Sequence, residues 1–211
     1  MVRAIKWSSL FFIGFIVVTQ QVISNGQLIA LDAKIANAGR TDFPSWIDFL
    51  LMRIDDLGLR GLTATALMIA AIYIARRLKT WRPVNLAILS LLALNLTVGL
   101  AKLLIGRTKP QLNVDLIYAG GLSYPSGHAS NALLSWGVLA YLIYRYAHVD
   151  RYRGRLASTG VALISLSVCV VSLFRNTHWL SDLVGGLFIG AALLVMVIAV
   201  DRFVPSNSQL S

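Results

Sequence analysis

The sequence has few charged residues and a single cysteine. Of its 211 residues, 13% are Asp, Glu, Lys or Arg and 57% are hydrophobic, and the mean hydropathy is +0.71. Soluble domains carry about 25% charged residues, so this composition excludes an ordinary soluble fold. All 9 acidic residues are aspartates, for which the sequence offers no physical reason. We interpret the chain as an integral membrane protein.

The single cysteine, Cys169, excludes an intrachain disulfide. With no second cysteine and no clustered His and Asp ligands, the sequence also disfavours a zinc site. We therefore expect a site without a metal or other cofactor. No soluble domain, low-complexity tract or internal repeat interrupts residues 1–211, so we expect one transmembrane domain.

Six apolar runs are long enough to cross the ~30 Å hydrocarbon core of a bilayer, which takes roughly 20 helical residues. They cover residues 5–23, 57–75, 84–104, 128–147, 156–174 and 183–200. The runs are continuous, whereas the strands of a membrane barrel alternate apolar and polar residues. This pattern predicts an all-α bundle of six transmembrane helices.

The first run follows Arg3 and Lys6 and resembles a signal peptide. It continues into polar residues 19–21 without a small-x-small cleavage site, which favours an uncleaved first helix. Cleavage remains the alternative, and it would leave the predicted orientation unchanged.

The cations are distributed unevenly between the two sides of the predicted bundle. The N-terminal tail holds two of the 19 lysines and arginines, the second and fourth connections hold four each, and the C-terminal tail holds one. On the other side, aspartates offset most of the cations. The positive-inside rule therefore predicts cytoplasmic N and C termini. The formal charge of +10 then reflects this bias and an attraction to anionic lipid headgroups, and it does not indicate binding to nucleic acid.

The longest connection, residues 24–56, contains an apolar and aromatic stretch at residues 46–52. Such a stretch predicts a short helix lying at the membrane interface. It would either shape the entry of a lipid or simply cover the end of the bundle.

His178 and Asp182 are four residues apart at the start of the sixth run. On a helix they would share one face, where the carboxylate can accept a hydrogen bond from Nδ1 of the imidazole. Nε2 would then be free to act as a nucleophile or base. Arg175 joins this face if the helix reaches back that far. The alternative is a juxtamembrane Arg-Asp pair beside an interfacial histidine.

Residues 125–128 read Pro-Ser-Gly-His and precede an apolar run. Ser126 can cap a helix, and Gly127 lets the backbone approach a ligand closely. The N-H groups of a helix start bind anions, so His128 would stand beside a bound phosphate and could protonate a leaving oxygen. An ordinary capped helix with an interfacial histidine is the alternative.

Three cations, Lys102, Arg107 and Lys109, lie near the end of the third run. Pro110 disfavours helix at Lys109, so we expect the helix to end by Thr108 and the cations to converge on an outer loop. They could clamp phosphate oxygens. Snorkelling side chains that contact headgroups are the alternative.

Together, these three segments in this order resemble the motifs of the type-2 phosphatidic acid phosphatase superfamily, K-x6-R-P, P-S-G-H and S-R-x5-H-x3-D. The second motif is complete, and the third is present at His178 and Asp182. Lys109 stands where the family has Arg, which keeps the charge but loses the bidentate fork. Ser172 stands where the third motif has Arg, and we expect Arg175 or Arg107 to replace it.

The resemblance implies a metal-independent phosphatase with active-site segments at residues 102–110, 125–128 and 172–182. His178 would be the nucleophile, Asp182 would hold its tautomer, and His128 would protonate the leaving group. Lys102, Lys109, Ser126, Gly127, Arg175 and Arg107 would bind the phosphate.

The resemblance also implies a lipid phosphate substrate at the outer face of the cell membrane, in a multi-pass protein. Polyprenyl diphosphate, phosphatidylglycerol phosphate and phosphatidic acid are the candidates. A lipid-linked phosphotransferase with an alcohol acceptor, or a non-catalytic lipid-phosphate-binding protein, stays open. The sequence does not predict the oligomeric state.

Overall fold

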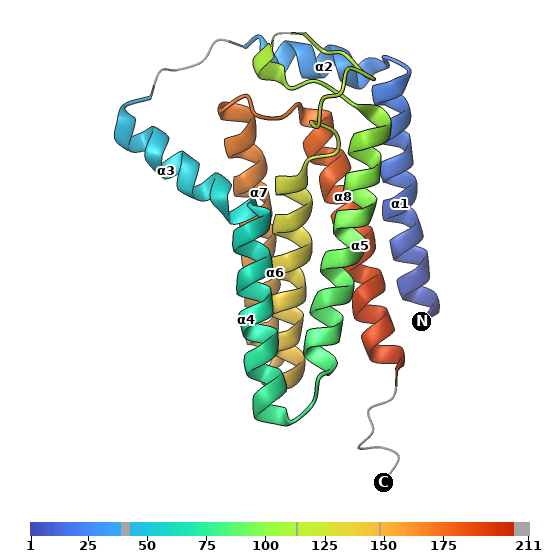
Figure 1. Ribbon diagram of the computed structural model, residues 1–211, viewed down its shortest axis with the longest axis vertical. Coiled ribbons are helices and arrows are strands. Elements are labelled where there is room, and N and C mark those ends of the chain that lie inside the picture. Colours follow the sequence, from blue (N-terminus) through green and yellow to red (C-terminus); the bar gives the residue numbers. More distant parts are fainter. Residues whose placement is uncertain (39–42, 113, 148, 205–211) are drawn as a thin grey trace.

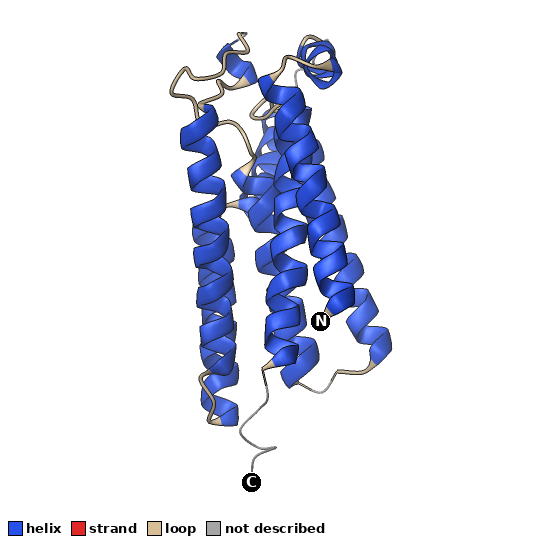
Figure 2. Ribbon diagram, turned by 90° about the vertical axis from the view of Figure 1, so that its right-hand side faces the viewer, coloured by secondary structure: helices blue, strands red, loops and turns tan. Residues whose placement is uncertain are grey.

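The computed structural model describes residues 1–38, 43–112, 114–147 and 149–204, and within them eight α-helices and two 3-10 turns. Six long helices run side by side along the long axis of the molecule (Figures 1 and 2). Their bounds are α1 Val2–Ile23, α4 Arg60–Leu78, α5 Arg82–Ile105, α6 Gly127–Tyr146, α7 Arg151–Phe174 and α8 Leu180–Phe203. Each of the six predicted apolar runs coincides with one of these helices, which confirms the all-α prediction.

Five of the described helices, α1, α4, α5, α7 and α8, are long and apolar enough to cross a membrane. The 20-residue helix α6 carries Ser130, Asn131 and Ser135, and its hydropathy is too low for it to be among these five. It packs against α4, α5, α7 and α8, so its polar residues are enclosed by protein rather than exposed to lipid. Its low hydropathy follows from its position, because polar residues in a membrane bundle face the interior.

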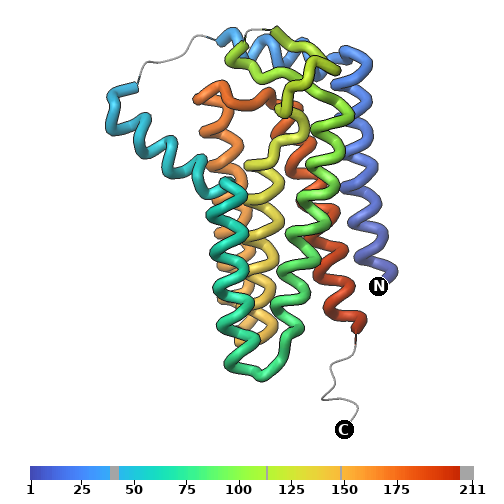
Figure 3. The backbone as a smooth tube through the Cα atoms, viewed as in Figure 1, coloured from blue at the N-terminus to red at the C-terminus, as the bar shows by residue number. Residues whose placement is uncertain are grey.

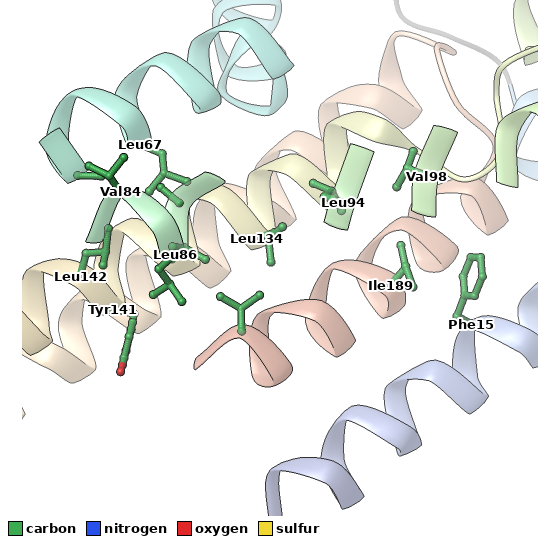
Figure 4. Packing of buried hydrophobic residues seen from close by; sticks show 14 of the residues in the cluster. Phe15, Leu67, Val84, Leu86, Leu94, Val98, Leu134, Tyr141, Leu142 and Ile189 are labelled. Carbon is green, nitrogen blue, oxygen red and sulfur yellow. The ribbon is translucent and has the colours of Figure 1, made fainter. Parts of the chain in front are cut away.

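The apolar core lies between α6 and the helices around it. Figure 4 shows Leu134 of α6 near Leu94 of α5 and Ile189 of α8, and all three side chains are almost completely buried. Leu67 of α4 and Phe15 of α1 belong to the same cluster. Many other large apolar side chains on α1, α5 and α7 are exposed on the outside of the bundle, as expected for helices that face lipid.

Small residues on α8 allow α6 to approach closely near the start of both helices. A Cβ atom added at Gly186 would lie 2.5 Å from the carbonyl oxygen of Ser126, and one at Gly190 would lie 3.2 Å from that of Ser130. Small residues have this role at helix crossings in membranes. The glycines therefore bring the segment before α8 beside the first turn of α6.

Two short helices lie at the end of the bundle where α6 and α8 begin. The predicted interfacial helix is present as α3, Ser45–Asp55, which projects sideways from the bundle (Figure 3). The sequence did not predict α2, Gln27–Ala36, which lies across this end (Figure 1). Helix α1 begins and α8 finishes at the opposite end.

Candidate active site

In the first motif, the chain leaves α5 at a residue with left-handed backbone conformation. The helix ends at Ile105, and Gly106 has φ +57°, a conformation that glycine adopts without a Cβ penalty. The helix thus ends before Thr108, as predicted. The chain that follows folds back along residues 116–123, and the Arg107 carbonyl accepts a hydrogen bond from the Ser123 N-H at 3.0 Å.

The second motif is the capped helix start that the sequence predicted. Ser126 is the N-cap of α6, and its Oγ accepts a hydrogen bond from the Ala129 N-H at 3.3 Å. The Ser126 N-H donates to the carbonyl oxygen of Asp182 at 2.9 Å, which ties the second motif to the third. Gly127 and His128 therefore occupy the first turn of α6, where backbone N-H groups are unpaired.

The third motif differs from the prediction in its secondary structure. Helix α8 begins at Leu180, so His178 precedes it and does not share a helical face with Asp182. The two side chains still meet, with 3.4 Å between Nδ1 of His178 and Oδ2 of Asp182. That carboxylate oxygen also accepts the Trp179 N-H at 3.1 Å, so Asp182 caps the helix and orients the imidazole together.

The two histidines of the site face one another, His128 from the first turn of α6 and His178 from the segment before α8. Their ring centroids are 6.1 Å apart, and the planes are inclined by 57°. His178 is buried and His128 is half-buried. Nδ1 of His178 makes the contact with Asp182, and no hydrogen bond joins its Nε2 to another described residue. This geometry leaves Nε2 available to a substrate.

Arg107 is a structural cation, which the phosphate-binding hypothesis did not expect. Its side chain is fully buried and donates hydrogen bonds to Asp182 at 2.8 Å, Asp32 at 2.7 Å, Asp115 at 2.8 and 2.6 Å, and Ser181 at 2.7 Å. With the guanidinium surrounded by three carboxylates, no donor is directed to a phosphate. Arg107 holds Oδ1 of Asp182, while Oδ2 faces the histidine.

Helix α2 supplies one of these carboxylates. Asp32 is buried and accepts hydrogen bonds from the Ser181 N-H at 2.9 Å and from Arg107. Burial raises the pKa of Asp32, although the hydrogen bonds from Ser181 and Arg107 oppose this shift. The start of α8 is therefore fixed from both sides, by Asp32 and by the Arg107 guanidinium.

The two lysines of the first motif lie close enough to His128 to interact with it electrostatically. Nζ of Lys102 donates to the carbonyl oxygen of Leu122, and a Cβ atom added at Gly127 would lie 3.9 Å from its Cε. Lys102 is half-buried and Lys109 is exposed. The lysines are the cations of the first motif that carry no carboxylate partner within the described residues.

The place of the missing motif arginine is taken by a buried polar group. Ser172 is fully buried and donates a hydrogen bond to Asp55 at 2.8 Å. Arg175 is the C-cap of α7, so it does not lie on α8 as the sequence suggested. Its Nη1 is 3.5 Å from Asp55, and its Nε is 3.8 Å from Asp48. Arg175 and Ser172 therefore both contact Asp55, and this carboxylate links the guanidinium to the Ser172 position.

Three polar contacts of the site were missed from the sequence. Ser123 donates to Oδ2 of Asp182, Asp32 bonds Arg107, and Asp55 lies near His128. The single sequence signal was the presence of aspartates in two amphipathic segments, one in residues 27–36 and two in residues 45–55. Asp32 is 75 residues from Arg107 along the chain, and Asp55 is 117 residues from Ser172, so no local pattern reveals the pairing.

This is a helical membrane protein whose bundle end brings together two histidines, a carboxylate that orients one of them, and two lysines. The comparisons with known proteins agree with this class. Residues 83–204 match the PAP2 superfamily, and the chain belongs to this family of phosphatases, which are hydrolases. The match covers the three motifs, so the resemblance seen in the sequence is confirmed.

A protein and a solved structure, both from Bacillus subtilis, resemble this chain along most of its length. Phosphatidylglycerophosphatase B of strain 168 is 23% identical over 194 residues, which are 90% of this chain and 93% of that protein. The crystal structure of a transmembrane PAP2-type phosphatidylglycerolphosphate phosphatase superposes with a TM-score of 0.79 at 21% identity. That match covers 94% of this chain and 98% of the other, and it confirms the fold.

Proposed function

We propose that this protein removes phosphate from a membrane lipid by way of a phosphohistidine at His178. The observation that carries the proposal is the contact of Nδ1 of His178 with Asp182, 3.4 Å long, opposite His128 at a centroid separation of 6.1 Å. A nucleophile oriented by a third group and a separate acid are the parts that covalent phosphoryl transfer needs.

In the proposed reaction, Nε2 of His178 attacks phosphorus while the P-O bond to the lipid breaks. His128 gives its proton to the departing alcohol or phosphate oxygen. A water molecule then loses a proton to His128 and attacks the phosphohistidine, which releases inorganic phosphate and restores both histidines. Asp182 keeps its negative charge and stabilises the charged imidazole of His178. No step requires a metal or nucleotide.

The phosphate oxygens would be held by cations and by the start of α6. Lys102 and Lys109 supply positive charge near His128. The unpaired N-H of Gly127 and the positive end of the helix dipole add donors, with Ser126 holding the turn. Arg175 completes the set in place of the motif arginine if phosphate displaces it from Asp55. Preorganised charge of this kind provides much of the catalysis in phosphoryl transfer.

The proposed orientation has six spans, with α6 as the enclosed one, and cytoplasmic N and C termini. Helix α1 begins and α8 finishes at the end of the bundle opposite the histidines (Figure 1), and the cation-rich connections also lie at that end. The active site then opens to the outer face of the cell membrane.

Phosphatidylglycerol phosphate is the substrate that we propose to test first. The similar protein and the similar solved structure from Bacillus subtilis are both named for this lipid, and it is one of the three candidates from the sequence. The apolar side chains exposed around α5 and α3 near the site suit a substrate that arrives from the bilayer.

The test measures phosphate release by the full chain in detergent with EDTA, from phosphatidylglycerol phosphate, polyprenyl diphosphate and phosphatidic acid in parallel. We expect release from at least one lipid, none with His178→Ala, and a reduction of about 10²–10⁴-fold with His128→Ala. An alkaline quench of labelled substrate should trap phosphohistidine in the wild type.

Lys109→Ala and Lys34→Ala form a matched pair, because both remove an exposed lysine at the same end of the bundle. The Lys109 variant should raise KM, and the Lys34 variant should not. Release that persists with His178→Ala at an unchanged rate would exclude the proposed nucleophile.

A further inference from the structure

The end of the bundle opposite the histidines contains a cavity of about 770 Å³ between α6, α7 and α8. Tyr144, at its rim, is 16 residues from His128 on the same helix, which corresponds to roughly 24 Å along the axis. At its inner end the cavity reaches Leu133, five residues from His128, but none of the residues that line it belongs to the candidate active site. Its volume lies in the range of about 300–1,000 Å³ that is typical of sites for small molecules.

The inner wall of the cavity is apolar. Leu133 and Ala140 of α6 and Leu194 and Ile198 of α8 are among its lining residues. These side chains are only half-buried, although they lie between packed helices. A wall of this kind can bind a hydrocarbon chain, since each methylene buried against it contributes a favourable free energy of transfer from water.

The mouth of the cavity is lined by three arginines. Arg151 and Arg155 are four residues apart on the first turns of α7 and so lie on one face of that helix, and Arg202 lies near the end of α8. All three are exposed. The guanidinium of Arg202 lies 5.6 Å from the ring centroid of Tyr141.

The nearby carboxylates already have other partners. Asp201 is bound by Arg82 at 2.7 Å and by the hydroxyl of Tyr141 at 2.6 Å. Asp150 caps α7 and lies 3.5 Å from Arg153. Within residues 1–38, 43–112, 114–147 and 149–204, no carboxylate is within salt-bridge distance of the three mouth arginines. The mouth is therefore a positive rim above an apolar cavity.

We propose that this cavity binds an anionic phospholipid, with the phosphate group at Arg151, Arg155 and Arg202 and one acyl chain along α6 and α8. Basic pockets between transmembrane helices have this selectivity for anionic headgroups. A free anion would use the rim but not the apolar wall, which is why the occupant is a lipid. The bound lipid would brace α7 against α6 and α8, with its headgroup at the end of the bundle opposite the histidines.

The test uses the full chain in a neutral detergent, titrated with phosphatidylglycerol while native mass spectrometry counts the bound lipid and a thermal scan records Tm. Phosphatidylcholine and inorganic phosphate are titrated in separate arms. The variant Arg151→Gln/Arg155→Gln removes two mouth charges. Arg76→Gln/Arg77→Gln is the matched control, because these arginines are exposed at the same end of the bundle on α4 and do not line the cavity.

We expect the mouth variant to bind phosphatidylglycerol about 25-fold more weakly, from roughly fivefold per arginine near a membrane surface. The control pair should bind within about twofold of the wild type. Ala140→Leu, which narrows the cavity without altering charge, should reduce retention of the lipid and of its effect on Tm. Equal weakening in both arginine pairs, equal binding of phosphatidylcholine, or equal protection by inorganic phosphate would overturn the proposal.

Discussion

Replacing Arg107 by glutamine should unfold the active-site end of the bundle rather than weaken substrate binding alone. The arginine donates to three carboxylates, of which Asp182 and Asp32 are almost completely buried. Glutamine has no charge and cannot reach all of these oxygens. Removing one partner from a buried ion pair costs about 3–5 kcal/mol, because the remaining charge has neither solvent nor a counter-ion.

A loss of this size should lower Tm by roughly 6–20 °C, since 1 kcal/mol corresponds to about 2–4 °C in a chain of this length. Thermal unfolding in detergent provides the measurement, and phosphate release is assayed well below the lowered Tm. Arg107→Lys keeps a charge but loses the planar fork that bridges the carboxylates. It should fall between the wild type and the glutamine variant in both assays.

Lys109→Gln is the matched control, because it removes an exposed cation two residues away. It should raise KM and leave Tm within about 1 °C. The reasoning would be refuted by the opposite pattern, in which Arg107→Gln keeps the Tm of the wild type and only raises KM. Arg107 would then be a phosphate ligand, as the sequence suggested, and the carboxylates around it would have no structural role.

Two further predictions concern the bundle itself. Gly186→Ala should lower Tm and activity together, because the new methyl group would lie 2.5 Å from the carbonyl oxygen of Ser126. Gly99→Ala is the control, because a methyl group there meets no atom within 4 Å. It should stabilise its helix by about 0.5–1 kcal/mol. Arg82→Gln should destabilise the opposite end by about 1–3 kcal/mol, since the buried Asp201 loses the hydrogen bond from a partly exposed cation. KM should stay unchanged, and a raised KM would contradict the separation of the two ends.

The catalytic candidates were predictable because each belongs to a short local pattern. Hydrophobic runs of roughly 20 residues identify helices whatever their neighbours are. The cap at Ser126 and the four-residue spacing of His178 and Asp182 are likewise local, and both segments meet in the structure through the hydrogen bond from Ser126 to Asp182. The helical face proposed for His178 was wrong, because Asp182 instead caps the start of α8.

The sequence by itself therefore determined the membrane location, the six long helices and the three motifs, since these depend on composition and short spacings. The tertiary structure alone decided what each cation does. Arg107 and Lys109 are two residues apart, yet one is enclosed by carboxylates from distant segments and the other is exposed. Pairing across a bundle depends on which helices pack together, and the spacing of charges along a chain does not encode that choice.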